Sequence, residues 1–184
     1  ETTISADGPK TYADYQKLAE GEPYQLINGM FVKSPSPVIN HQRLIKRIEW
    51  ALIPLEKKGI GELLYAPLDV YFSDTEVYQP DIIFIAKDNK LVEVDTIVTG
   101  APDIVIEVLS PSTAYYDLRH KAKVYAESGV KEYWIVDPGE KSVEIFSNSK
   151  GSFTPEQKAE GDCGAASKLF PEFHIELGKL FREM

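Results

Sequence analysis

The stretch between Pro80 and Pro138 constrains the fold more than any other part of the chain. Strand-like apolar runs and one helical pattern follow one another there without a linker: residues 81–86, 104–109, 115–128 and 132–136. A strand, a helix and a strand in succession imply a right-handed crossover and parallel pairing of the two strands. We therefore predict that residues 104–109 and 132–136 are neighbouring parallel strands in one sheet.

The rest of the chain supplies elements that can flank this unit. Periodicity and turn signals predict a helix over residues 11–18, a hairpin over 24–32, a long helix from about residue 40, strands at 61–66 and 69–73, and a returning strand at 143–146. Asn28-Gly29 is a strong signal for the hairpin turn. Pro54 conflicts with the long helix, which is predicted either to kink there or to end near Ile53.

These elements predict an α/β (α+β) fold in which a mixed sheet is flanked by helices. The strands before residue 104 are close in sequence, so we expect them to pair in the antiparallel sense. The 184 residues fit one domain. We assign residues 1–184 to it, with a helix and hairpin extension at about residues 10–33.

Two acids, Asp81 and Glu107, stand in the apolar runs of this unit. A buried carboxylate is costly unless a cation or strong hydrogen bonds compensate it. Side chains alternate along a strand, so the two carboxylates converge if their strands are neighbours. Mg²⁺ prefers such oxygen ligands, and it polarises phosphoryl oxygens and activates water. The pattern therefore indicates a metal site built on Asp81 and Glu107.

The following helix offers a cation to this site. Its apolar stripe is formed by Leu118, Ala122 and Tyr125. At about 100° per residue, Lys121 lies near that stripe and Lys123 points toward water. Lys121 is thus predicted to send its ammonium toward the sheet, where it can stabilise a phosphate or orient water. Asp117, four residues earlier, is positioned to pair with Lys121.

Several residues near the predicted site also have a plainer interpretation. Asp81 follows a proline and fits a turn at the start of a strand, and Lys121 fits a solvated helix lysine. Asp69 is either a ligand near the site or a residue engaged in local hydrogen bonds. His41 is expected to be a helix cap or a surface contact.

Composition narrows the class of function. The formal net charge of −9 argues against a protein that coats nucleic acid, but an enzyme acting on DNA can confine its basic residues to one groove. Candidates for phosphate contacts are Arg43, Lys46, Arg47, Arg119 and His120. A lone cysteine, Cys163, favours a reducing compartment, and we expect the cytoplasm. The sequence contains no run of 18 consecutive apolar residues, so it predicts no membrane-spanning helix.

Several motifs together are similar to one known family. They are the run 24–29, Ser34-Pro35 with His41-Gln42, Ala66-Pro67-Leu68-Asp69-Val70, Gln79-Pro80-Asp81, the runs 100–103 and 107–113, the helix pattern Asp117, Lys121 and Tyr125, and the run 129–138. On these residues the chain resembles the Uma2-like restriction endonuclease family (DUF820), a branch of the PD-(D/E)XK nuclease superfamily. The resemblance covers nearly the whole chain.

The resemblance implies a restriction-endonuclease-like core that hydrolyses phosphodiester bonds in DNA with Mg²⁺ (or Mn²⁺). Asp81 matches the acid of the PD motif and Glu107 the acid of the second motif. Leu109 stands where the second motif usually has its lysine, and Lys121 matches a lysine that has moved to the helix. Many such nucleases cut as dimers, so the resemblance also suggests a homodimer.

Gln25 departs from the family pattern. The family usually reads Glu-Leu-Ile-Asp-Gly where this chain reads Gln25-Leu26-Ile27-Asn28-Gly29. If that glutamate contributes to the metal site, Gln25 removes a charge from it. Two alternatives to a DNA endonuclease therefore stay open: a catalytically weak or inactive module that binds DNA or protein, and a hydrolase of another phosphorylated substrate.

Overall fold

A computed structural model gives the structure of the protein and describes residues 8–18, 21–34, 36–110 and 115–184. Its main sheet has six strands, in the spatial order β12 (Ser152–Glu160), β11 (Ser142–Ser149), β10 (Glu132–Asp137), β9 (Ile104–Val108), β6 (Ile82–Ala86) and β3 (Gly61–Tyr65). A second sheet has the order β2 (Met30–Lys33), β1 (Tyr24–Ile27), β5 (Glu76–Tyr78), β4 (Val70–Ser73), β8 (Val98–Thr99) and β7 (Glu93–Val94). A short pair of strands completes the β-structure: β13 (Gly164–Ala166) and β14 (His174–Glu176).

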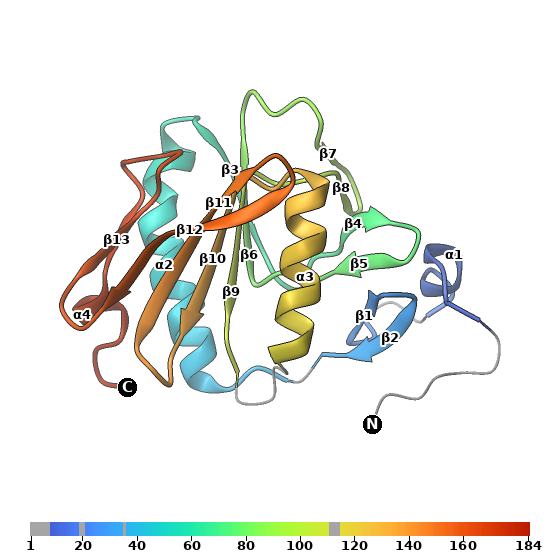
Figure 1. Ribbon diagram of the computed structural model, residues 1–184, viewed down its shortest axis with the longest axis horizontal. Coiled ribbons are helices and arrows are strands. Elements are labelled where there is room, and N and C mark those ends of the chain that lie inside the picture. The colour runs from blue at the N-terminus through green and yellow to red at the C-terminus, as the bar shows by residue number, and fades with distance from the viewer. Residues whose placement is uncertain (1–7, 19–20, 35, 111–114) are drawn as a thin grey trace.

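The helices are α1 (Tyr12–Tyr15), α2 (Ile39–Lys57), α3 (Tyr115–Ser128) and α4 (Leu177–Leu180). Helix α2 covers one face of the main sheet, while α3 lies on the other face, between the two sheets (Figure 1). None of the helices in the described residues is long and apolar enough to cross a membrane.

The predicted crossover is confirmed. Strands β9 and β10 are parallel and α3 connects them, whereas β6 pairs with β9 in the antiparallel sense. In that pairing, Ile82 lies opposite Ile106 and Ile83 lies opposite Val105. Both large sheets contain parallel and antiparallel pairs, which confirms the α+β class with mixed sheets flanked by helices.

Alternation along the central strands separates two hydrophobic cores. Ile82 and Ile106 face α2, and they pack with its buried residues Leu44, Ile48, Leu52 and Leu55. Ile83 and Val105 face α3, and they join Tyr125 and Tyr78 in the second core. A side chain that shares the face of Ile83 therefore points into the space between the main sheet and α3.

Local sequence signals explain two boundaries. The hairpin between β1 and β2 turns at Asn28 and Gly29, which have φ angles of 51° and 68°. Those two residue types tolerate this left-handed conformation best. Helix α2 ends just before Gly59, whose φ angle is 68°, a common conformation after a helix end.

Helix α2 continues through Pro54 to Lys57, so the prediction that it ends near Ile53 is wrong. Pro54 stands in the last turn, where one missing N–H donor costs a single hydrogen bond and the buried residue Leu55 still packs on the sheet. Packing of the apolar stripe outweighs the local penalty.

Candidate active site

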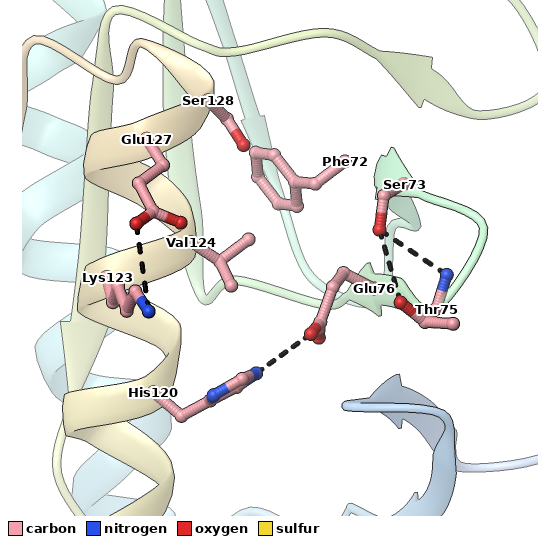
Figure 2. Close-up of a pocket in the computed structure, with 9 residues that line it drawn as sticks. All are labelled: Phe72, Ser73, Thr75, Glu76, His120, Lys123, Val124, Glu127 and Ser128. Carbon is pink, nitrogen blue, oxygen red and sulfur yellow. Dashed lines mark hydrogen bonds and ion pairs between the residues drawn. The ribbon is translucent and has the colours of Figure 1, made fainter. Parts of the chain in front are cut away.

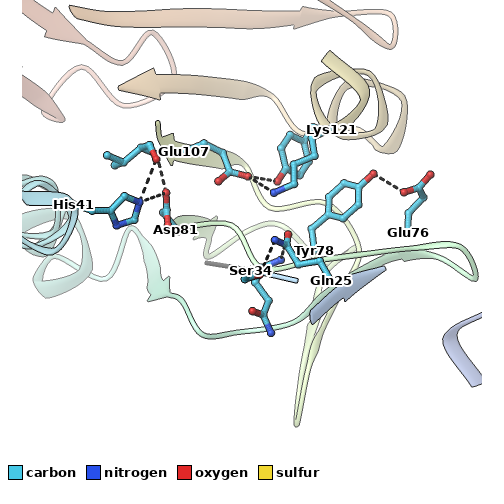
Figure 3. A network of polar contacts seen from close by, with 11 residues as sticks. Gln25, Ser34, His41, Glu76, Tyr78, Asp81, Glu107 and Lys121 are labelled. Atoms are coloured by element: carbon cyan, nitrogen blue, oxygen red, sulfur yellow. Dashed lines mark hydrogen bonds and ion pairs between the residues drawn. The ribbon is translucent and has the colours of Figure 1, made fainter. Parts of the chain in front are cut away.

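The pairing of β6 with β9 brings the two predicted acids together. Asp81 directly precedes β6, and continuing the observed register by one residue places it opposite Glu107 on β9. Glu107 alternates with residues of the second core and reaches toward α3, while the carboxylate of Asp81 lies at the end of the strand beside His41 of α2 (Figure 3). Glu107 is 8% exposed.

Glu107 accepts two hydrogen bonds from α3. Its Oε1 lies 3.2 Å from Lys121 Nζ and 2.7 Å from the hydroxyl of Tyr125 (Figure 3). Burial raises the pKa of Glu107; the ammonium of Lys121 opposes that shift, and the nearby carboxylate of Asp81 adds to it. A second positive charge between the two carboxylates would relieve both the burial and the repulsion.

Asp81 is held by the end of β9 and by α2. Its Oδ2 accepts a hydrogen bond from Val108 N at 2.7 Å and lies 3.2 Å from His41 Nε2. The same ring nitrogen lies 3.1 Å from the carbonyl oxygen of Val108, so Nε2 faces two acceptors and carries the hydrogen. The N–H of His41 therefore orients the carboxylate of Asp81 through Oδ2.

His41 corrects the expectation of a helix cap or surface contact. Its side chain is 13% exposed and reaches the end of the sheet from the first turn of α2. Burial lowers the pKa of His41, but the hydrogen bond and charge of Asp81 outweigh burial, and the net pKa is raised. Sequence alone does not show this contact, because it depends on where α2 crosses the sheet.

The two lysines of α3 take the predicted orientations. Lys121 is 8% exposed, and its ammonium also lies 5.5 Å from the ring centroid of Tyr78. The side chain of Lys123 is 70% exposed and pairs with Glu127 at 3.8 Å. Lys121 thus lies against the carboxylate of Glu107, and Lys123 is exposed to solvent.

Two of the remaining predicted residues, Gln25 on β1 and Asp69 just before β4, belong to the region of the second sheet. Gln25 on β1 accepts a hydrogen bond from Gln79 N at 2.9 Å and donates one to Ser34 Oγ at 3.0 Å (Figure 3). Asp69 Oδ1 accepts hydrogen bonds from the Tyr15 hydroxyl at 2.8 Å and from Gln79 Nε2 at 2.9 Å. Both residues make local hydrogen bonds beside the site. The side chain of Asp117 lies outside the described residues.

A further carboxylate, that of Glu76 on β5, supports the site. It accepts hydrogen bonds from the Tyr78 hydroxyl at 2.6 Å and Asn28 N at 2.9 Å, and it lies 2.8 Å from His120 Nε2. Glu76 and His120 line a cavity of about 260 Å³ between α3 and the β4–β5 hairpin (Figure 2). Glu76 thereby fixes the ring of Tyr78, which lies beneath Lys121.

The donor set fits a hard divalent cation. Asp81 and Glu107 offer carboxylate oxygens, and the carbonyl oxygen of Val108 lies beside Asp81. Among the described residues, no three His, Cys, Asp or Glu side chains form a complete metal cage. Mg²⁺ commonly binds through one or two carboxylates and completes its shell with water and substrate oxygens. Two convergent acids are therefore sufficient for such an ion.

Comparison with known proteins assigns the fold to a family. Residues 11–178 match the model of the Uma2 family, described as "Putative restriction endonuclease". The chain belongs to the Uma2 family. An uncharacterized Synechocystis protein, sll1609, is 28% identical over 135 residues, which cover 69% of this chain and 74% of that protein.

A solved structure shares the fold of this Uma2 protein. It is a DUF820 protein of Anabaena variabilis ATCC 29413, described as a putative nuclease, with 23% sequence identity and a TM-score of 0.78. The match covers 94% of this chain and 98% of that chain. The two chains thus share their architecture over nearly their full lengths.

Proposed function

We propose that the protein is a metal-dependent endonuclease that hydrolyses phosphodiester bonds in DNA. The observation that carries the proposal is the meeting of Asp81 and Glu107 across β6 and β9, with Lys121 Nζ 3.2 Å from Glu107. Two acids and a lysine around one point suit phosphoryl chemistry, in which negative charge must be neutralised. Membership of a restriction endonuclease family supports this choice of substrate.

Asp81 and Glu107 are the residues proposed to hold Mg²⁺ or Mn²⁺. The bound ion supplies Lewis-acid polarisation of a phosphoryl oxygen and a more acidic water. Tyr125 and Lys121 fix the carboxylate of Glu107, and His41 and the Val108 amide fix that of Asp81. The role proposed for Lys121 is to stabilise, through its ammonium, the charge that develops on the phosphate.

Nicking of supercoiled plasmid tests the proposal. The wild-type protein is expected to nick plasmid with Mg²⁺ or Mn²⁺ and to stop when EDTA is added. Asp81→Asn and Glu107→Ala are expected to remove the activity, while Glu127→Ala on the exposed side of α3 keeps it. Equal nicking by the wild type and Glu107→Ala would disprove the assignment, because a contaminating nuclease does not depend on this residue.

A binding module without catalysis is the second candidate, and the environment of Gln25 favours it. Gln25 uses both ends of its amide, at Gln79 N and Ser34 Oγ, and it brings no charge to the site. This candidate predicts DNA or protein binding that EDTA does not change and no heat of Mn²⁺ binding in calorimetry. Gln25→Glu is then the informative variant, since restored nicking would identify a weakened nuclease. A homodimer stays a prediction that sedimentation can test.

A further inference from the structure

The outer surface of α2 has a composition that the proposed active site does not use. Trp50 is 58% exposed and Ile39 is 72% exposed, and both lie on the helix face that carries Arg43 and Lys46. Beside this face is a groove, the α2–α4 groove, with a cavity of about 350 Å³ lined by Arg47, Trp50, Ala51, His174, Ile175, Glu176, Lys179, Leu180 and Arg182. An exposed tryptophan at the edge of a groove indicates a contact surface.

The charge of this surface is opposite to that of the whole protein. The chain carries a net charge of −9, yet Arg43, Lys46, Arg47, Lys179 and Arg182 all belong to this face or to the groove. Glu176 is the one acid among the residues that line the groove, and its carboxylate pairs with Lys179 at 2.8 Å. An excess of positive charge on one face of the molecule is complementary to a polyanion.

Arg47 and Lys46 make contacts on this surface. Arg47 donates hydrogen bonds to the carbonyl oxygens of Leu180 at 2.5 Å and Arg182 at 3.1 Å, which fastens the C-terminal segment to α2. The ammonium of Lys46 lies 5.3 Å from the centroid of the Trp50 ring. The surface therefore presents an aromatic ring and positive charges side by side.

We propose that the outer face of α2 and the α2–α4 groove bind single-stranded nucleic acid. An unpaired base stacks on the indole of Trp50, and Arg43, Lys46 and Lys179 contact the flanking phosphates. Alternating aromatic and cationic contacts are how proteins bind single strands without reading their sequence. Bases inside a duplex are already stacked, so a double strand offers nothing to Trp50.

This surface is separate from the candidate active site. His41, which contacts Asp81, and Trp50 are nine positions apart, which places them on opposite sides of α2 and about 13 Å apart along its axis. The inference rests on the proposed function only for the choice of nucleic acid as ligand. Binding here needs neither the metal nor Glu107, so the two proposals can fail independently.

Intrinsic fluorescence provides a direct test, because the chain has two tryptophans and Trp134 is fully buried. Titration of the full chain with a 20-nucleotide oligo(dT) in EDTA is expected to quench the emission of Trp50. The logarithm of the binding constant should fall with the logarithm of salt with a slope of roughly −2, as for three phosphate contacts on a single strand. The same strand annealed to its complement should bind at least tenfold more weakly.

Variants assign the binding to this surface. Trp50→Ala should weaken oligo(dT) binding, followed by anisotropy of a labelled strand, by roughly 5- to 150-fold, the loss expected for one stacked base. Arg43→Ala combined with Lys46→Ala should weaken it and flatten the salt slope. The matched control, Lys87→Ala with Lys90→Ala, removes the same charge from two exposed lysines elsewhere and should leave the affinity unchanged.

Two results would overturn the inference. One is wild-type affinity for oligo(dT) in Trp50→Ala, and the other is an equal loss of affinity in the control pair. If wild-type affinity in Trp50→Ala is accompanied by a change from dimer to monomer in sedimentation, this face is a contact between copies of the chain. Glu107→Ala should still bind oligo(dT), so a protein that binds but never nicks refutes the proposed function and leaves this inference standing.

Discussion

Lys121 and Lys123 are two positions apart on α3 and have opposite surroundings. Lys121 is buried against Glu107 and Tyr78, whereas Lys123 is exposed and pairs with Glu127. We expect Lys121→Met to reduce the rate of metal-dependent plasmid nicking by roughly 10²- to 10³-fold, because one preorganised charge beside the phosphate is lost. The initial nicking rate at saturating Mn²⁺ measures this effect.

Lys123→Met is the matched control for that variant. It removes the same charge from the same helix, two residues away, and should keep the nicking rate within about twofold, as expected for an exposed pair. Similar losses in both variants would mean that the net charge of α3, rather than the position of Lys121, controls the rate.

His41 permits a prediction about metal binding. Its Nε2 contacts Asp81 Oδ2 and the carbonyl oxygen of Val108, so we expect His41 to orient Asp81, the proposed metal ligand, and not to bind the ion itself. His41→Ala should weaken Mn²⁺ affinity by about 10- to 100-fold, as loss of an outer-shell partner commonly does. Calorimetry measures the affinity, and His41→Gln, which keeps a side-chain N–H donor, should recover part of it. Unchanged affinity in His41→Ala would contradict the orienting role.

The sequence predicts the central residues of the candidate site but not their support. Asp81, Glu107 and Lys121 can be placed because strand alternation and helical spacing determine which way a side chain points. His41 and Glu76 cannot be placed in this way, since each reaches the site from an element that pairs or packs at long range. Buried polar contacts of that kind follow from tertiary geometry rather than from local pattern.

At the scale of elements, Glu76 joins three parts of the fold. Its carboxylate accepts hydrogen bonds from the β1–β2 turn at Asn28 and from Tyr78 on β5, and it contacts His120 on α3. Glu76→Ala should lower the free energy of unfolding by about 1–3 kcal/mol, because the buried Tyr78 hydroxyl loses its acceptor. Urea denaturation followed by circular dichroism measures the change.

An exposed glutamate serves as the control for Glu76. Glu172 pairs with Lys58 at 2.8 Å, and both side chains are more than half exposed. Glu172→Ala should change the free energy of unfolding by only about 0–1 kcal/mol. If both variants unfold at the same urea concentration as the wild type, Glu76 does not hold the second sheet against α3.

Pro54 interrupts the hydrogen bonds of α2 without ending the helix. It has no N–H to donate to the carbonyl oxygen of Trp50, four residues earlier. Pro54→Ala restores that donor and should raise the free energy of unfolding by about 1–3 kcal/mol. This value is the stabilisation of the helix less the stabilisation that is lost because alanine makes the unfolded chain more flexible than proline does. Thermal melting checks this expectation, and a lower melting temperature would show that proline rigidity matters more here.

The elements that the sequence predicts share a repeating apolar pattern, and those it misses lack one. Strands β6, β9 and β10 and helix α3 follow the predicted ranges closely. Strand β5 has three residues and all are buried, so no alternation marks it. Strand β12 is largely exposed and contains Pro155 at a bulge, and it forms because β11 offers a partner along its length. Pairing, not hydrophobic pattern, creates such strands.

At the scale of the whole molecule, the candidate site lies where separate layers meet. Asp81 and Glu107 belong to the main sheet, Lys121 to α3 and His41 to α2, while the second sheet supports them through Tyr78. A ligand bound at this junction contacts residues whose relative positions exist only in the folded chain. Binding of a metal ion should therefore stabilise the entire fold.

Mn²⁺ is expected to raise the melting temperature of the wild-type protein. An ion that binds the folded state alone adds about 2.7 kcal/mol at a concentration 100 times its dissociation constant. For a chain of this length that free energy corresponds to a shift of roughly 5–10 °C. Scanning calorimetry with and without Mn²⁺ measures the shift, and excess EDTA should reverse it. Glu107→Gln keeps the size of the side chain and removes its charge, so it should lose most of the shift. An equal shift in the wild type and Glu107→Gln would place the bound ion elsewhere on this acidic protein.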